Sequence, residues 1–363
     1  MLRVIKKLFA RSQENEVQFT FESFPERLIN GYRRAKGKIY KFLKFRYKWY
    51  FYPEARKVPK FPMNIHMEAS SACELKCDHC FRQYMDMREN QFMSFEMWKK
   101  IIDECKNYDD LYTVKFSMRG EPTSDPDLPN KISYAKKMGI PEVWINTHGG
   151  NLTEEFTRKL LEAGPDWITV SLDGLDEMYE SIRKPQKWDD IFIKVKRLKR
   201  LRDEIAPNII LNTQGLWSAI KHDPKEYYER LRPYFDRIVY NSDMNFKEIA
   251  LVPDPNYVCP RLWTSLAITS NGDILKCPSD FEKDEVIGNV RNKTIKEVWD
   301  TEQEKNRQSH LSGKKNTSIA CKKCHHGAIK VPKKIDVKED ISFIAKEYKY
   351  KDDFDGVGLN RKK

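Results

Sequence analysis

Three cysteines lie within eight positions of the segment SACELKCDHCFRQ, which runs from residue 71 to residue 83. Cys73, Cys77 and Cys80 are separated by three residues and then by two. A closed zinc or iron site normally takes four protein ligands, whereas a catalytic metal site keeps one position open. Three thiolates can hold three corners of a cubane 4Fe–4S cluster and leave one iron without a protein ligand. The spacing therefore indicates a catalytic iron–sulfur site.

Four further cysteines form a second group in the last third of the chain. Cys259 and Cys277 flank a hairpin-like segment with Gly272 in the turn sequence NGD, and Cys321 and Cys324 form a CKKC pair. Four thiolates can occupy every protein-ligand position of one cluster. This second site would then be closed to any other ligand.

The cysteines could also attach haem, bind zinc or serve as buried apolar residues. The start MLRVIKKLFARSQ is a poor secretory signal, so we expect a cytoplasmic protein with reduced thiols. Haem attachment normally follows export, which argues against CKKCH (321–325) as a c-type haem site. Zinc remains an alternative for the second group. For the first group it is disfavoured, because His79 is too close to Cys80 to complete a zinc knuckle. Cys105, in a helix-like stretch opened by Ser94, is expected to be a buried apolar residue.

Short apolar strands alternate with amphipathic helices from about residue 62 onward. This order indicates a parallel α/β sheet with right-handed crossovers, and six such units predict an open, partial (β/α)6 TIM-like barrel. In such folds chemistry takes place at the carboxyl ends of the strands. The expected strands are 64–69, 113–118, 143–146, 167–172, 209–213 and 237–241, and the expected helices are 94–107, 127–138, 153–163, 188–205 and 223–234.

Polar motifs follow the first four expected strands. The three-cysteine loop comes after the first, RGEP (119–122) after the second, NTHGG (146–150) after the third and SLDG (171–174) after the fourth. Because the carboxyl ends of parallel strands meet at one edge of a sheet, we expect these motifs to form one site.

The segment CELKCDHC resembles the signature of the radical S-adenosylmethionine (SAM) superfamily, CxxxCxxC with an aromatic or similar residue before the last cysteine. His79 stands at that place, and Phe81 follows the last cysteine. The resemblance spans residues 62–330. It implies that the amine and carboxylate of SAM bind the open iron, and that an electron from the cluster cleaves SAM to a 5′-deoxyadenosyl radical, which abstracts hydrogen from the substrate.

The same resemblance implies the remaining contacts of SAM. RGEP resembles the GGE motif of the family, which carries over to Glu121 as acceptor for the SAM amine. VSLDG followed by SIRK resembles the Ser-then-Arg pair that contacts the ribose and carboxylate, which carries over to Ser171 and Arg183. Asn146 matches a further position near SAM. Arg119 replaces a glycine of the family pattern, and either pairs with an acidic substrate group or bridges to a nearby carboxylate.

The order of the second cysteine group resembles the C-terminal SPASM module of radical SAM enzymes. No cysteine follows CKKC, so the chain looks like the shortened "twitch" form with one auxiliary 4Fe–4S cluster. The cofactors implied are therefore two 4Fe–4S clusters and SAM. If four cysteines close the auxiliary cluster, its role would be to accept an electron from the substrate radical, which completes a two-electron oxidation.

The charge of the chain is concentrated at its start. Residues 1–60 hold sixteen Lys or Arg against five Glu, and the whole chain has a net charge of +12. The rest is close to neutral, which argues against a nucleic-acid enzyme with a basic cleft. We expect a basic, aromatic N-terminal extension (1–60), the barrel (61–250), a small Fe–S module (251–330) and a charged, solvated tail (331–363). The extension either packs as helices on the main domain, which we favour, or contacts a membrane surface or an acidic partner.

The substrate is the least constrained part of the prediction. A small molecule such as a sugar, aminocyclitol or sugar conjugate is favoured, because one-cluster twitch members of the family include an aminocyclitol dehydrogenase. Modification of a peptide or protein and a non-catalytic Fe–S or zinc protein are the alternatives. An electron donor such as flavodoxin or ferredoxin is implied. Arg119 and Asp243 are candidates for the acid or base by position alone.

Overall fold

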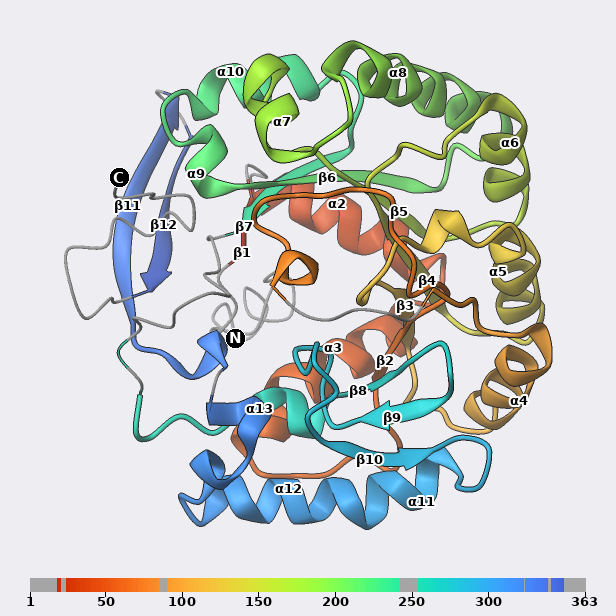
Figure 1. The fold of residues 1–363 in the computed structure, drawn as a ribbon, viewed down its shortest axis with the longest axis vertical. Helices are drawn as coiled ribbons and strands as arrows, with labels where there is room; N and C mark the ends of the chain where they lie inside the picture. Colours follow the sequence, from red (N-terminus) through yellow and green to blue (C-terminus); the bar gives the residue numbers. More distant parts are fainter. Residues whose placement is uncertain are drawn as a thin grey trace.

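Six parallel strands in chain order form the centre of the molecule, in a computed structural model that describes residues 18–20, 24–84, 90–241, 252, 254–322, 324–338 and 341–348. Each strand pairs with the next, which confirms the predicted partial barrel (Figure 1). The strands are β2 (Asn64–Met67), β3 (Thr113–Phe116), β4 (Glu142–Thr147), β5 (Trp167–Ser171), β6 (Ile210–Leu216) and β7 (Arg237–Asn241).

Helices surround the outer side of these strands (Figure 1). Ser94 caps α4 by accepting a hydrogen bond from the Met97 N–H, and Cys105 at the end of that helix is buried as expected. Two short helices, α7 (Asp176–Ile182) and α9 (Trp217–Ile220), had no clear periodicity and were not predicted. The predicted helices are α4 (Phe95–Cys105), α5 (Leu128–Lys137), α6 (Glu154–Glu162), α8 (Trp188–Ile205) and α10 (Pro224–Leu231).

The C-terminal module continues the sheet of the barrel. Strand β8 (Ser265–Ile268) pairs in parallel with β2, and β9 (Asp273–Leu275) and β10 (Val286–Asn289) follow as antiparallel strands. Gly272 has a φ of +90° in the turn between β8 and β9, which only glycine adopts readily. On the other edge, β1 (Gln18–Thr20) pairs antiparallel with β7. The module also contains α11 (Ile295–Asp300), α12 (Glu302–Leu311) and α13 (Ile319–Lys322), and short 3-10 turns cover Phe81–Gln83, Pro122–Ser124, Pro260–Trp263, Lys315–Thr317 and His325–Gly327.

Two N-terminal helices, α2 (Phe24–Ala35) and α3 (Ile39–Glu54), close the amino-terminal end of the barrel. Phe42 and Phe45 are buried against Met63 and Tyr112, which precede the first two strands. Basic side chains of α2 and of the turn after it pair with acids at the starts of three strands: Arg34 with Glu142, Arg33 with Asp236 and Lys36 with Asp166. Helices α2 and α3 of the extension therefore pack on the main domain, opposite the carboxyl ends of the strands.

The charged tail contains an antiparallel hairpin of β11 (Lys330–Lys338) and β12 (Ile341–Tyr348), which the alternating charges did not predict. No helix among the described residues is both long enough and apolar enough to cross a membrane.

Candidate functional site

The three-cysteine loop leaves the carboxyl end of β2 and is fixed against the end of β3. The Glu121 backbone N–H donates to the Ala72 carbonyl at 2.7 Å. Gly120 allows this close approach, because a Cβ there would lie 2.2 Å from the Ser70 carbonyl oxygen. The loop and RGEP therefore meet at one edge of the sheet, as predicted.

The three thiols of the loop act on one another electrostatically. Burial raises the pKa of the Cys77 thiol to about 12; the charges of Cys80 and Cys73 act in the same direction, whereas Arg183 opposes them. Thiols with raised pKa values stay protonated until a metal displaces the proton, so cluster assembly here would release protons.

The ligating atoms around a single zinc ion lie close together. Bonds of about 2.3 Å hold the sulfurs around one zinc about 3.8 Å apart. Among the described residues, the one set of three or more ligating side chains that closes to within 4.8 Å is Cys73, Glu74 and His148. Among the described residues, no set of three cysteine sulfurs meets this limit.

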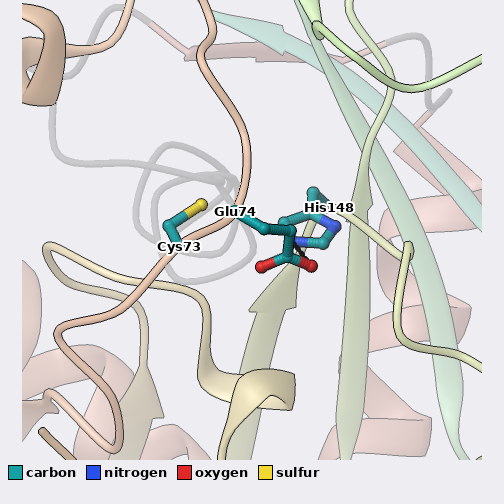
Figure 2. Close-up of side chains that lie close together, drawn as sticks. All are labelled: Cys73, Glu74 and His148. Carbon is teal, nitrogen blue, oxygen red and sulfur yellow. Dashed lines mark ion pairs between the residues drawn. The ribbon is translucent and has the colours of Figure 1, made fainter. Parts of the chain in front are cut away.

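His148 lies beside Cys73 and Glu74 and was not singled out from the sequence (Figure 2). Its Nδ1 accepts a hydrogen bond from the Gly150 N–H, which leaves the proton on Nε2. That Nε2 lies 3.0 Å from Glu74 and 3.5 Å from Glu121, and its contact lowers the pKa of Glu74 to about 2. Since Cys73 belongs to the cluster loop, these three residues border the cluster site and are not a separate metal site.

Glu121 is buried at the centre of the edge. One carboxylate oxygen accepts from the Thr123 N–H at 3.0 Å and from the Thr147 hydroxyl at 2.6 Å, and the other accepts from the His148 N–H at 2.9 Å. These bonds hold the carboxylate in one orientation, as a fixed acceptor for an ammonium group requires.

Asp173, in the SLDG motif, joins two of the predicted SAM contacts. Its Oδ2 accepts from Arg183 at 2.6 Å and lies 3.4 Å from His79 Nε2. Burial lowers the pKa of His79 to about 4, so this imidazole is neutral at physiological pH. Asp173 thus fixes the side chains of the loop and of the Ser-then-Arg segment relative to each other.

The other predicted SAM contacts lie at the same edge. Asn146, within β4, donates to Ser117, while its buried Oδ1 has no hydrogen-bond partner in the described part of the chain. Ser171, at the end of β5, accepts from Gln214 at 3.2 Å. Phe81 stacks on Phe281 of the C-terminal module, with ring centroids 4.2 Å apart. An orphaned acceptor such as the Asn146 oxygen is what a polar ligand would satisfy.

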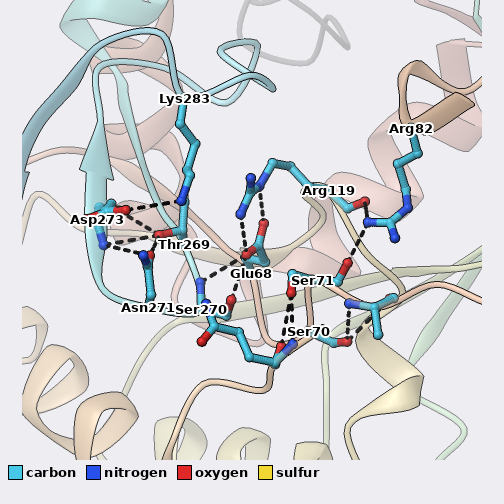
Figure 3. A network of polar contacts seen from close by, with 12 residues as sticks. Glu68, Ser70, Ser71, Arg82, Arg119, Thr269, Ser270, Asn271, Asp273 and Lys283 are labelled. Carbon is cyan, nitrogen blue, oxygen red and sulfur yellow. Dashed lines mark hydrogen bonds and ion pairs between the residues drawn. The ribbon is translucent and has the colours of Figure 1, made fainter. Parts of the chain in front are cut away.

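Arg119 forms a buried ion pair with Glu68, which follows β2 (Figure 3). The pair is bidentate, with N–O distances of 2.6 and 2.9 Å, and the two side chains are 3% and 0% exposed. Glu68 also accepts from the backbone N–H and the hydroxyl of Ser270, in the turn between β8 and β9. This geometry favours the bridging alternative for Arg119, and it ties the barrel to the C-terminal module. Asp243 lies outside the described residues.

Glu68→Gln is expected to lower the free energy of unfolding by about 3–5 kcal/mol, because it leaves the Arg119 charge buried without a counter-charge. The amide oxygen can still accept from Ser270, so the loss reports on the ion pair. Urea denaturation of the anaerobically purified protein measures it. Adding Arg119→Met should recover most of the stability; a double variant as unstable as the single one would contradict this account.

The four cysteines of the second group also converge. Burial raises the pKa of the Cys277 thiol, and the charges of Cys324, Cys259 and Cys321 raise it further. His310, on α12, was missed by the sequence analysis: its Nε2 lies 3.3 Å from Cys321 Sγ. Burial, followed by nearby lysines, lowers its pKa to about 4, so it is neutral.

The site residues that were not predicted differ in how strongly the sequence marks them. His148 lies inside the motif NTHGG and Asp173 inside SLDG, where Asn146 and Ser171 were the predicted site residues. Glu68 is an acid in an otherwise apolar strand segment. His310 stands eleven residues before Cys321 in a polar helix, and nothing local marks it.

Two family models match the chain. Residues 67–213 match the model described as the radical SAM superfamily, and residues 259–325 match the SPASM iron–sulfur cluster-binding domain. The two models cover both cysteine groups and the edge described above.

Curated relatives match only part of the chain. The tungsten-containing aldehyde ferredoxin oxidoreductase cofactor-modifying protein of Pyrococcus furiosus is 29% identical over 143 residues, which is 39% of this chain and 40% of the relative. The Fe-coproporphyrin III synthase of Methanosarcina barkeri is 37% identical over 111 residues, 31% of this chain and 27% of the relative. The chain therefore spans less than half the length of these relatives.

Solved structures share the fold. The crystal structure of BtrN in complex with AdoMet and 2-DOIA has a TM-score of 0.52 at 19% identity, over 74% of this chain and 94% of that one. Streptococcus suis SuiB bound to precursor peptide SuiA has a TM-score of 0.52 at 18% identity, over 74% of this chain and 72% of that one.

Proposed function

The chain belongs to the radical SAM superfamily and carries a C-terminal SPASM domain, and we propose that it oxidises a small molecule by two electrons. When bound, SAM and the two 4Fe–4S clusters supply a hydrogen-abstracting 5′-deoxyadenosyl radical and an acceptor for the second electron. The substrate would lose one hydrogen atom to the radical, which gives 5′-deoxyadenosine, and then one electron and one proton. An external donor such as flavodoxin or ferredoxin supplies the electron that cleaves SAM.

The observation that carries this proposal is the difference between the two cysteine groups. Three thiols converge at the strand ends, so one iron would stay open for SAM. Four thiols converge in the C-terminal module, so no iron would remain for substrate. A closed cluster beside a radical site suits electron transfer, and a "twitch"-like single cluster needs only these four ligands.

The residues at the strand ends would hold SAM. The fixed carboxylate of Glu121 would accept the SAM amine, and the free oxygen of Asn146 would accept a further donor. Arg183, oriented by Asp173, would face the carboxylate, and Ser171 the ribose. Gly120 lets the end of β3 lie directly against the cysteine loop. Any larger residue at this position would clash with the backbone of that loop.

For the substrate we propose a sugar, aminocyclitol or sugar conjugate. The likeness to BtrN bound to AdoMet and 2-DOIA supports a small molecule, because that chain is matched over 94% of its length. A peptide or protein side chain is the second candidate, supported by the likeness to SuiB bound to its precursor peptide.

The test follows deuterium. The protein is reconstituted anaerobically with iron, sulfide and SAM, and specifically deuterated sugars, aminocyclitols and peptides are offered in turn. Transfer of deuterium from a small molecule into 5′-deoxyadenosine, with about eight irons per chain, is expected. Transfer only from a peptide would establish the second candidate. About four irons or fewer, with bound zinc, would overturn the two-cluster proposal.

We also propose that the outer face of α3 contacts anionic membrane surfaces, while the protein itself works in the reducing cytoplasm. Tyr40, Lys44 and Tyr47 recur at helical spacing on this face, and the two tyrosines are 81% and 51% exposed. Lys38 and Gly37 in the preceding turn are exposed too. Exposed aromatic side chains can insert at the level of the lipid headgroups, and lysines between them are attracted to anionic headgroups.

Lys44→Gln is expected to weaken binding to vesicles of phosphatidylcholine with phosphatidylserine about fivefold, since one lysine near an anionic surface contributes about 1 kcal/mol. Co-sedimentation measures the bound fraction, and Lys305→Gln, at another exposed position, on α12, is the control. If the unaltered protein binds pure phosphatidylcholine vesicles as strongly as the mixed vesicles, the proposed electrostatic contact is wrong.

A further inference from the structure

His310 stands between two ligands of the second cysteine group. It lies on α12 and is 6% exposed. Its Nδ1 is 3.4 Å from the backbone nitrogen of Cys259, and its Nε2 is 3.3 Å from Cys321 Sγ. One imidazole therefore spans from the backbone of the first ligand to the sulfur of the third.

The backbone contact fixes which nitrogen carries the proton. A peptide N–H can only donate, so the Cys259 N–H requires a lone pair on Nδ1. A neutral imidazole with an acceptor at Nδ1 carries its proton on Nε2. The remaining N–H is thereby directed at Cys321 Sγ.

Further donors and cations surround the same four sulfurs. The Tyr257 side chain hydrogen-bonds Cys259, and Arg261 acts electrostatically on that thiol. Lys315 is bound to the backbone carbonyls of Asp254 and Tyr257, and its charge acts on His310. Positive charge and N–H or O–H groups thus gather where extra negative charge would reside on reduction.

We propose that His310 is a positioning residue that donates an N–H···S hydrogen bond to Cys321 and raises the reduction potential of the cluster held by the four cysteines. The inference rests on the proposed function, in which that cluster accepts the second electron. Reduction adds one negative charge to the cluster and its thiolates, and a hydrogen-bond donor stabilises the more negative state. A higher potential favours transfer from the substrate.

The test compares reconstituted full-length variants by redox titration, followed by electron paramagnetic resonance. His310→Leu removes the donor, and we expect the equilibrium constant for one-electron reduction of the auxiliary cluster to fall about tenfold, which is 59 mV. His310→Gln keeps an N–H near the same place and should stay closer to wild type. The matched control is His222→Leu, an exposed histidine whose loss should change neither cluster.

A second measurement tests the bond itself and does not need the leucine variant to fold. Protein labelled with ¹⁵N in the histidine imidazole rings should show a weak nitrogen coupling on the reduced auxiliary cluster in pulsed paramagnetic resonance, and His310→Gln should abolish it. A coupling of the size of a directly bonded nitrogen would make His310 a ligand and overturn the proposal. So would an unchanged potential in a His310→Leu protein that holds about eight irons.

These outcomes separate the inference from the function on which it rests. If the wild-type chain binds about four irons only, no auxiliary cluster exists and the proposed function fails. If two clusters form but the potential of the second does not depend on His310, only the inference fails.

Discussion

Cys77→Ala is expected to abolish formation of 5′-deoxyadenosine from SAM and to lower bound iron from about eight to about four atoms per chain. Cys77 is the most buried of the three thiols in the loop, and the charges of Cys73 and Cys80 already act on it. Two thiolates cannot hold a cubane and still present one open iron in a fixed direction. Iron and sulfide assays with chromatography of 5′-deoxyadenosine measure the result.

Cys105→Ala is the matched control. Cys105 is also buried, but it packs in the apolar core at the end of α4. Its loss should leave iron content and SAM cleavage unchanged. Normal SAM cleavage in Cys77→Ala, or a loss of iron in Cys105→Ala, would contradict the assignment of the loop.

The barrel was predictable because its pattern is local. Each of the six strands is a short apolar run, and the helices between the strands carry their own caps, such as Ser94 before α4 and Thr153 before α6. The order β2 to β7 then follows from short right-handed connections. The same rule brought the polar motifs to one edge of the sheet, where Glu121, Asn146 and Ser171 lie.

The pairing of distant segments was not predictable in this way. That β8 pairs with β2 depends on contacts between residues about 200 positions apart, and short strands carry no local signal of their partner. Arg119 shows the consequence. From the sequence it had two alternative partners, an acidic substrate group or a nearby carboxylate, whereas its partner Glu68 and the link from Glu68 to Ser270 appear only in the fold.

The basic N-terminal extension illustrates a different limit. Composition showed the charge but not its use. Arg34 pairs with Glu142 at the start of β4, and Arg33 pairs with Asp236 just before β7, so part of the charge holds α2 on the barrel. Among the described residues of α3, Lys44 is exposed and available to an external surface.

The two cysteine sites are coupled through one continuous sheet. Phe81, directly after the last cysteine of the loop, stacks on Phe281, four residues after Cys277. The Arg119–Glu68–Ser270 contacts join the same two regions a second time. These two links hold the C-terminal module against the barrel, which the proposed electron transfer from the substrate to the auxiliary cluster would need.

Cys321→Ala is expected to separate the two halves of the reaction. Cys321 lies on α13, outside the strand-end edge, and its sulfur contacts His310. Bound iron should fall from about eight to about four atoms per chain, and SAM should still be cleaved to 5′-deoxyadenosine. Product should not form, because the substrate radical has lost its electron acceptor. Chromatography of both products in one reaction measures the split.

The outcome discriminates between electron transfer and simple support of the fold. If the auxiliary site only stabilises the protein, Cys321→Ala should reduce SAM cleavage and product formation together. If it accepts the electron, deuterium should still pass from substrate into 5′-deoxyadenosine in Cys321→Ala, while the oxidised product stays absent. Unchanged product formation would show that the second electron leaves by another route.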